Sequence, residues 1–262
     1  MKELEKIRAK LRSGEPVIGT CVNYNDSCIT EQLGLMGYDF VWIDMEHTGN
    51  DKREVLQHII AAKAAGTASF VRIPWNDPVL AKPILEMGPD GIIFPFIRSV
   101  AEAKQAISSC LYPPRGRRGF GPIRAAGYGV TSTADYIEGA ADSIFKMIQI
   151  EHIDAVDCME EIVKIEGIDA LVIGPMDLSG SLGKLGEVRG AKVLSVMDRI
   201  GEIGQKSGIP MMLAFGYSPV DIEDWISRGI RMISVNSDIG FIASAGAQTL
   251  RATKEMFIKK QG

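Results

Sequence analysis

The sequence predicts an α/β fold, a (β/α)8 TIM barrel formed by a single domain over residues 1–262. Three observations lead to this prediction. The chain has 262 residues, and a barrel of this type typically needs about 250. Eight short apolar, β-rich runs recur along the chain, and segments with helical spacing separate most of them. Hydrophobic residues make up 46% of the sequence, so a chain of this length can bury a large core.

The eight apolar runs are the predicted strands. Each is apolar throughout rather than alternating in polarity, as expected for a parallel strand that is covered on both faces. In chain order they are PVIGTCV (16–22), YDFVWID (38–44), SFVRI (69–73), GIIFPF (91–96), KMIQIE (146–151), DALVIG (169–174), PMMLAF (210–215) and RMISVN (231–236). An open, doubly wound sheet is the competing arrangement, but no GxGxxG motif follows an early strand to favour it.

Segments with helical spacing lie between most of these strands. The charged N-terminal stretch MKELEKIRAKLRSGE predicts one amphipathic helix, and the others are predicted at 52–65, 99–109, 153–166, 188–207 and 219–228. Ser218 followed by Pro219 is a favourable start for the last helix. Residues 112–133 break the pattern, because they are rich in Gly, Pro and Arg and have no helical period. A loop of this length inside a compact domain is usually functional or an interaction arm.

Charge and composition exclude several classes of partner. The net charge of −4 gives no electrostatic reason to expect nucleic acid. No apolar run approaches the roughly 18 residues of a membrane span, and the N-terminal segment lacks the apolar stretch of a signal peptide.

The long loop carries arginines that we interpret as internal or intersubunit contacts: Arg115, Arg117, Arg118 and Arg124. The cysteines form no CxxC pair: Cys21, Cys28, Cys110 and Cys158. We therefore expect a cytoplasmic protein that binds neither nucleic acid nor membrane.

Polar and ionisable residues follow the carboxyl ends of several predicted strands. In a β/α barrel these ends and the loops after them form the active site. The residues are, in chain order, Asp44, Glu46, His47, Arg72, Gln149, Glu151, the turn 174–177, Asn236 and Asp238. Because parallel strands bring their carboxyl ends to one rim, the sequence predicts a site at that rim.

Glu151 and Asp177 follow adjacent predicted strands. Two such carboxylates can hold one hard cation such as Mg²⁺ or Mn²⁺, which keeps several waters and leaves positions open for substrate oxygens. Solvated loop carboxylates, or a helix cap in the case of Asp177, are the alternative that spacing alone leaves open.

Two further side chains at this rim suit catalysis. His47 follows two acids, so a general base is one interpretation and a hydrogen-bonded structural histidine is the other. Arg72 ends an apolar strand and needs an anionic partner, which is either a substrate or a structural carboxylate. We interpret His58 and His152 as structural.

Six strings of the sequence resemble a known family: VWIDMEH, VRIPWNDP, GIIFPF, YPPRGRRGFGP, IQIE and DALVIGPMDLSGSLG. In this order they resemble the metal-dependent (class II) pyruvate aldolases of the HpcH/HpaI type, which act on hydroxy-oxo-heptanedioate and dehydrodeoxyglucarate. The resemblance runs from about Gly19 to the end of the chain. It implies a barrel of the phosphoenolpyruvate/pyruvate type. It also implies a carbon–carbon lyase that joins or separates pyruvate, as its enolate, and an aldehyde in 4-hydroxy-2-oxo acids.

The resemblance implies a divalent metal, Mg²⁺, Mn²⁺ or Co²⁺, with Glu151 and Asp177 as its ligands. Gln149 would line the same pocket, and Asp44 would help to organise the waters of the metal. The implied substrates are a small 2-oxo acid and an aldehyde. The implied assembly is a hexamer in which the loop after the fourth strand helps to form the sites of neighbouring subunits.

The resemblance also implies how the 2-oxo acid is held. Arg72 would contact the carbonyl oxygen of pyruvate and stabilise the enolate. His47 would take up or deliver protons. The backbone of Gly174, Met176 and Asp177 would hold the carboxylate.

Two departures from the family pattern stand out. Glu86 occupies the place of an Asp that would partner the histidine, and Met176 replaces an Ala before the metal-ligand Asp. The longer Glu86 makes the orientation of His47 less defined, and the bulk of Met176 should narrow the pocket. Two other functions remain open from the sequence. One is oxaloacetate decarboxylation or a related, macrophomate-synthase-like use of the enolate, and the other is a non-catalytic, ligand-binding barrel.

Overall fold

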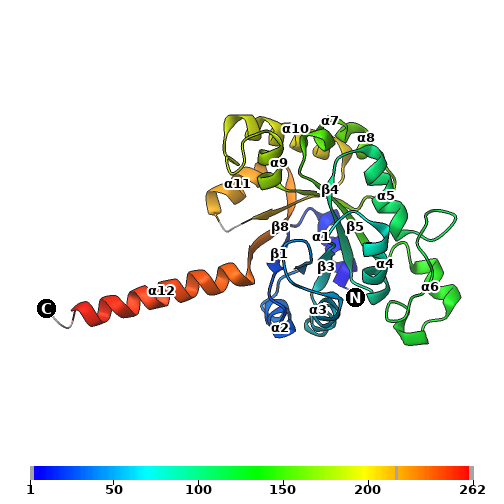
Figure 1. Ribbon diagram of the computed structural model, residues 1–262, viewed down its shortest axis with the longest axis horizontal. Helices are drawn as coiled ribbons and strands as arrows, with labels where there is room; N and C mark the ends of the chain where they lie inside the picture. The colour runs from blue at the N-terminus through cyan, green and yellow to red at the C-terminus, as the bar shows by residue number, and fades with distance from the viewer. Residues whose placement is uncertain (1–2, 216–217, 260–262) are drawn as a thin grey trace.

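The computed structural model describes residues 3–215 and 218–259, and its strands form a closed parallel barrel in the order β1 to β8 (Figure 1). The strands are β1 (Val17–Val22), β2 (Phe40–Asp44), β3 (Ala68–Arg72), β4 (Gly91–Ile97), β5 (Phe145–Ile150), β6 (Ala170–Ile173), β7 (Met211–Phe215) and β8 (Ile230–Ser237). The barrel closes where β8 pairs with β1, for example at Val17 opposite Met232. Each predicted strand is present, and the predicted (β/α)8 barrel is confirmed.

Most of the helices lie around the barrel, and α12 extends away from it (Figure 1). The helices are α1 (Glu3–Ser13), α2 (Ser27–Leu35), α3 (Lys52–Ala65), α4 (Pro78–Met87), α5 (Val100–Cys110), α6 (Thr133–Gly139), α7 (Ile153–Asp157), α8 (Met159–Ile162), α9 (Pro175–Ser181), α10 (Ala191–Ser207), α11 (Pro219–Ser227) and α12 (Asp238–Lys259). The segment 153–166, expected as one helix, is divided into α7 and α8 at Cys158. The long loop between α5 and α6 contains one short 3-10 turn, Gly127–Gly129.

Stacked aromatic rings fill the interior of the barrel. The ring centroids of Phe40 and Phe70 lie 4.9 Å apart, and those of Phe70 and Phe145 lie 5.6 Å apart. A Cβ atom at Gly19 would lie 2.5 Å from the ring of Phe40, so glycine at that position leaves room for the aromatic layer. Truncating one of these phenylalanines to alanine would cost about 3–5 kcal/mol of stability. The rigid interior fixes the directions in which the strand ends point.

One end of the barrel is closed by α1. Leu4 and Ile7 are buried and pack in the same cluster as Val17 and the aromatic layer. Buried Lys146 at the start of β5 forms an ion pair of 2.8 Å with Asp169 near the start of β6. Because the amino ends of the strands are covered in this way, the carboxyl ends are left for a site.

The last helix, α12, leaves the barrel and extends away from it (Figure 1). Its first residue, Asp238, is buried and accepts hydrogen bonds of 2.9 Å from the backbone N–H groups of Asn23 and Tyr24. The β1–α2 loop therefore holds the start of α12. Beyond that start α12 exposes apolar side chains, among them Ile242, Leu250 and Phe257. None of the helices in the two described ranges is both long and apolar enough to cross a bilayer.

Candidate active site

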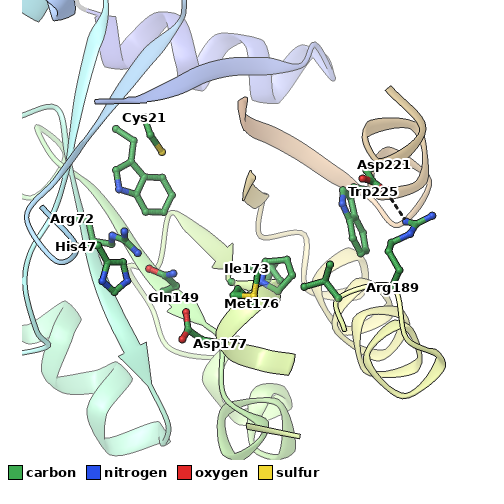
Figure 2. A pocket seen from close by; sticks show the side chains of 14 residues that line it. Cys21, His47, Arg72, Gln149, Ile173, Met176, Asp177, Arg189, Asp221 and Trp225 are labelled. Carbon is green, nitrogen blue, oxygen red and sulfur yellow. Dashed lines mark ion pairs between the residues drawn. The ribbon is translucent and has the colours of Figure 1, made fainter. Parts of the chain in front are cut away.

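A cavity of about 510 Å³ opens at the carboxyl ends of the strands (Figure 2). Its lining includes these residues singled out from the sequence: His47, Arg72, Gln149, Gly174, Met176 and Asp177. They come from β3, β5 and the segments that follow β2 and β6, so the barrel brings together residues that lie far apart in the chain. Asp44 and Glu151 lie directly behind this lining through their contacts with Arg72 and Gln149.

Arg72 is held by two acids that follow β2. Its Nε and Nη2 atoms donate to the two carboxylate oxygens of Asp44, at 2.8 Å each, and its Nη1 lies 2.9 Å from Oε2 of Glu46. The guanidinium also stacks over the ring of Trp42, 5.0 Å from its centroid. A planar, bidentate pair of this kind has a defined orientation. The two hydrogen bonds to Asp44 use two of the five N–H donors of the arginine and leave the others for a ligand.

Glu151 is buried at the end of β5 between two donors. Its Oε1 accepts from the backbone N–H of Phe96 at 2.8 Å, and its Oε2 accepts from Nε2 of Gln149 at 2.5 Å. Phe96 presents this N–H from a left-handed backbone with φ of 54°. Bulky residues rarely adopt that conformation, and its persistence is typical of functional sites. The ring of Phe96 lies between Trp75 and His152, with centroids 5.6 and 5.9 Å away.

The turn after β6 approaches Glu151 closely at Gly174. A Cβ atom there would lie 2.5 Å from Oε2 of Glu151 and 2.8 Å from its Cβ, so only glycine fits. The N–H of Gly174 donates to the carbonyl of Ile150, and the first hydrogen bond of α9 runs from Leu178 to Gly174. The N–H groups of Met176 and Asp177 precede that bond and suit an anion. Gly174 therefore positions the turn instead of donating to a ligand.

Three carboxylates repel one another in this pocket. Burial, and the negative charges of Glu46 and Asp177, raise the pKa of Glu151 to about 8, against the lowering effect of the Phe96 N–H. Burial also raises the pKa of Glu46, although Arg72 counteracts it. A cation placed among these groups would favour their ionised forms.

The donor set suits a hard divalent cation. Glu151 and Asp177 offer carboxylate oxygens, and the buried Oε1 of Gln149 has no hydrogen-bond partner among the described residues. Within residues 3–215 and 218–259, no group of three or more His, Cys, Asp or Glu side chains is arranged to hold a metal ion. Mg²⁺ typically takes one or two protein carboxylates and keeps its other positions for water or substrate.

His47 lies at the mouth of the pocket. Its side chain is 63% exposed, and its Nε2 lies 3.8 Å from Oε2 of Glu46. The other two histidines have structural contacts, as interpreted from the sequence. The Nδ1 of His58 lies 2.7 Å from the hydroxyl of Thr30, and the side chain of His152 caps α7 by accepting from the N–H of Asp154.

Glu86 does not reach this site within one chain. It lies near the end of α4, where Oε1 is 3.6 Å from Nη2 of Arg118, an arginine of the long loop. Burial raises the pKa of Glu86, and Arg118 offsets part of that effect. The expected Glu86–His47 contact is thus replaced by an internal pair with the loop. Arg124 likewise donates to the carbonyls of Met87 and Gly88, so Arg118 and Arg124 both have internal partners.

The sequence predicted no role for several residues at this site. Glu46 was noted at the end of β2 without a role, although its place beside Asp44 marked it as a rim residue. No sequence pattern predicted these other lining residues: Cys21, Trp42, Ile173, Val188, Arg189, Asp221 and Trp225. Several of these lie in the α9–α10 connection and on α11, where no pattern distinguishes a pocket wall from ordinary surface.

Comparison with known proteins identifies the family to which the chain belongs. A family model described as HpcH/HpaI aldolase/citrate lyase matches residues 18–245. A 5-keto-4-deoxy-D-glucarate aldolase of Klebsiella pneumoniae is 31% identical over 252 residues, which cover 95% of this chain and 97% of that protein.

Solved structures match over the same length. An HpcH/HpaI aldolase/citrate lyase family protein from Burkholderia cenocepacia superposes with a TM-score of 0.89 at 31% identity, covering 95% of this chain and 99% of that chain. Macrophomate synthase, at 24% identity and a TM-score of 0.83 over 97% of this chain and 90% of that chain, shares the fold. The predicted family and the predicted class of enzyme, a carbon–carbon lyase, are confirmed, and the chain belongs to the HpcH/HpaI aldolase/citrate lyase family.

Proposed function

We propose that this protein is a divalent-metal-dependent aldolase that joins pyruvate, as its enolate, to an aldehyde and cleaves the corresponding 4-hydroxy-2-oxo acids. One observation carries the proposal. Asp177 and the doubly held Arg72 line one pocket at the carboxyl ends of the strands, and buried Glu151 lies directly behind this lining. Membership in an aldolase family supports the same reaction.

Glu151 and Asp177 are the proposed metal ligands, with Gln149 beside them. The buried carboxylates and the free amide oxygen of Gln149 suit Mg²⁺, Mn²⁺ or Co²⁺. A divalent cation bound there supplies Lewis-acid polarisation of the carbonyl oxygen of the 2-oxo acid.

Arg72 is the proposed stabiliser of the negative charge that develops on that oxygen. Asp44 and Glu46 hold the guanidinium in place before substrate arrives, so little reorganisation is required. The N–H donors of Arg72 that Asp44 does not occupy are available to the substrate. Asp44 thus acts by positioning Arg72.

The N–H groups of Met176 and Asp177 are proposed to hold the carboxylate of the 2-oxo acid. Both lie in the first turn of α9, before its first internal hydrogen bond. Gly174, by contrast, contributes through the space that its missing side chain leaves for Glu151.

His47 is the proposed proton carrier. Its exposed ring at the pocket mouth exchanges protons with solvent, and Glu46 lies 3.8 Å from its Nε2. On cleavage, the proton of the 4-hydroxyl group leaves through His47 as the carbonyl of the aldehyde forms. Glu86 acts on this histidine only if a neighbouring subunit brings it there.

We propose that the protein forms a homo-oligomer, specifically a hexamer. Ile239, Ile242, Leu250 and Phe257 recur at helical spacing on one face of α12 and are exposed in the single chain. An apolar helix face of this kind is typical of a subunit interface. The proposed compartment is the cytoplasm, consistent with all four cysteines being free thiols.

Pyruvate release from 4-hydroxy-2-oxo acids, coupled to lactate dehydrogenase, tests the proposal with and without Mg²⁺, Mn²⁺ or Co²⁺. We expect release that depends on the metal and is lost in a chelator. Oxaloacetate decarboxylation without any aldol cleavage would instead favour the alternative use of the enolate. Binding of pyruvate with neither reaction would favour a non-catalytic barrel.

A further inference from the structure

The pocket has a second wall that faces the acids. In Figure 2, Gln149 and Asp177 lie on one side, while Trp225, Arg189 and Asp221 lie on the other. Ile173 and Met176 lie between the two groups. We call Ile173, Met176, Val188 and Trp225 the outer wall. A substituent that extends from a 2-oxo acid held near Arg72 would contact this outer wall.

The positive charge beside the outer wall is already neutralised. Arg189 lies 3.1 Å from Asp221 and 2.5 Å from Asp224, and it stacks over the ring of Trp225 at 5.9 Å. Arg228, on the same ring at 5.1 Å, pairs with Asp224 and, at 2.8 Å, with Asp198. Two cations therefore share three carboxylates. A further carboxylate from a substrate would meet occupied donors and net negative charge.

The side chains that form the outer wall are apolar. Trp225 is almost fully buried as part of the hydrophobic core, whereas the side chain of Met176 is half exposed and lines the cavity. Moving an alkyl or aryl group onto this surface removes apolar area from water. Moving a carboxylate there removes its hydration without supplying a free partner.

Building on the proposed function, we propose that the outer wall is the acceptor subsite and that the aldehyde carries an uncharged alkyl or aryl substituent instead of a carboxylate. In the synthetic direction the enolate carbon of pyruvate attacks the carbonyl carbon of this aldehyde. The electron pair of the C=O bond moves to its oxygen, which takes one proton and becomes the 4-hydroxyl group. The product is a 4-hydroxy-2-oxo acid with an apolar end.

A matched pair of substrates tests the acceptor subsite. We would compare kcat/KM for metal-dependent cleavage of 4-hydroxy-2-oxoheptanoate and 4-hydroxy-2-oxoheptanedioate, which differ in a terminal methyl or carboxylate. We expect the methyl-ended acid to be preferred by about tenfold or more. Equal cleavage, or preference for the carboxylate-ended acid, would overturn the apolar subsite and leave the aldolase in place.

Exchange of the methyl protons of pyruvate with deuterium separates the two proposals, because enolate formation needs no aldehyde. Metal-dependent exchange with cleavage of the carboxylate-ended acid but not of the methyl-ended acid would overturn the subsite alone. Absence of exchange and of cleavage would overturn the aldolase and, with it, the subsite.

A charge placed on the outer wall provides a second test. Val188→Lys should shift the kcat/KM ratio toward the carboxylate-ended acid by about tenfold, because the new cation has no carboxylate already assigned to it. Leu185→Lys is the matched control, since Leu185 lies in the same connection, is 72% exposed and does not line the pocket. We expect this control to leave the ratio unchanged. An unaltered ratio in Val188→Lys would remove the outer wall from acceptor recognition.

Discussion

The guanidinium of Arg72 and the carboxylate of Asp44 form a bidentate pair, with both N–H···O distances at 2.8 Å. The two residues are register partners on β2 and β3, so the pairing of the strands itself sets this contact. Asp44 is buried, which shields the pair from solvent and salt. The pairing of β2 with β3 therefore fixes the orientation of the Arg72 side chain.

Replacing Arg72 by Lys tests that orientation. A lysine keeps the positive charge but lacks the planar guanidinium that pairs with both oxygens of Asp44. We therefore expect kcat for pyruvate release to fall by about 10²–10³-fold. Arg98→Lys is the matched control, because Arg98 makes a similar forked contact with Asp154 but is half exposed and lies outside the pocket. Steady-state kinetics with and without metal provide the measurement. Unchanged kcat in Arg72→Lys would rule out a requirement for the bidentate guanidinium that Asp44 orients.

The proposed metal ligands predict a thermal shift. At a metal concentration about 100 times its Kd, linkage stabilises the native protein by about 2.7 kcal/mol, or a Tm rise of about 5–10 °C. We expect Asp177→Ala and Glu151→Gln to lose this rise and Glu187→Gln, an exposed carboxylate, to keep it. Differential scanning fluorimetry against metal concentration measures the effect. A full rise in Asp177→Ala would exclude it as a ligand.

Gly174 predicts a steric effect on the same site. In Gly174→Ala the new Cβ would meet Glu151 at 2.5–2.8 Å, so the carboxylate must move. We expect at least about tenfold weaker metal binding, as seen when the groups that orient metal ligands are lost. Gly139→Ala is the control, because a Cβ there meets nothing within 4 Å. Isothermal titration with Mn²⁺ would show the difference, and equal affinities would contradict the close approach.

The raised pKa of Glu151 predicts how the metal-free protein responds to pH. With a folded pKa of about 8 against a usual 4.5, the folded state binds the proton more tightly than the unfolded state. The stabilisation is present below the usual pKa and is lost as pH rises toward 8, so Tm in chelator should fall between pH 5 and 8. Glu151→Gln should flatten this slope, leaving a smaller one of the same sign from Glu46. A Tm that rises with pH in the wild type, or a slope unchanged in Glu151→Gln, would contradict the assignment.

The exposed face of α12 predicts an assembly contact. Leu250→Asp places a charge on that face and should shift the protein to a smaller species, because an unpaired charge in an apolar interface is unfavourable. Gln248→Asp adds the same charge two residues away, on a different side of the helix. Light scattering after size-exclusion chromatography distinguishes them. An unchanged mass in Leu250→Asp would remove this face from the interface.

The strand positions could be predicted from the sequence because parallel strands covered on both faces are continuously apolar. Their carboxyl ends then identified Asp44, Arg72, Gln149 and Glu151 as rim residues, since the topology of a β/α barrel places all such ends together. The positions of the strand ends were sufficient for this prediction, and the directions of the side chains were not required.

Only the tertiary structure decided which rim side chains meet. Glu46 reaches Arg72, and Phe96 turns its N–H toward Glu151, through backbone geometry that no local pattern encodes. Glu86 pairs with Arg118 because the long loop folds back over the end of α4. The apolar wall around Trp225 and the departure of α12 depend likewise on long-range packing. Periodicity in a sequence reports burial along one element, whereas these contacts depend on how separate elements are placed in space.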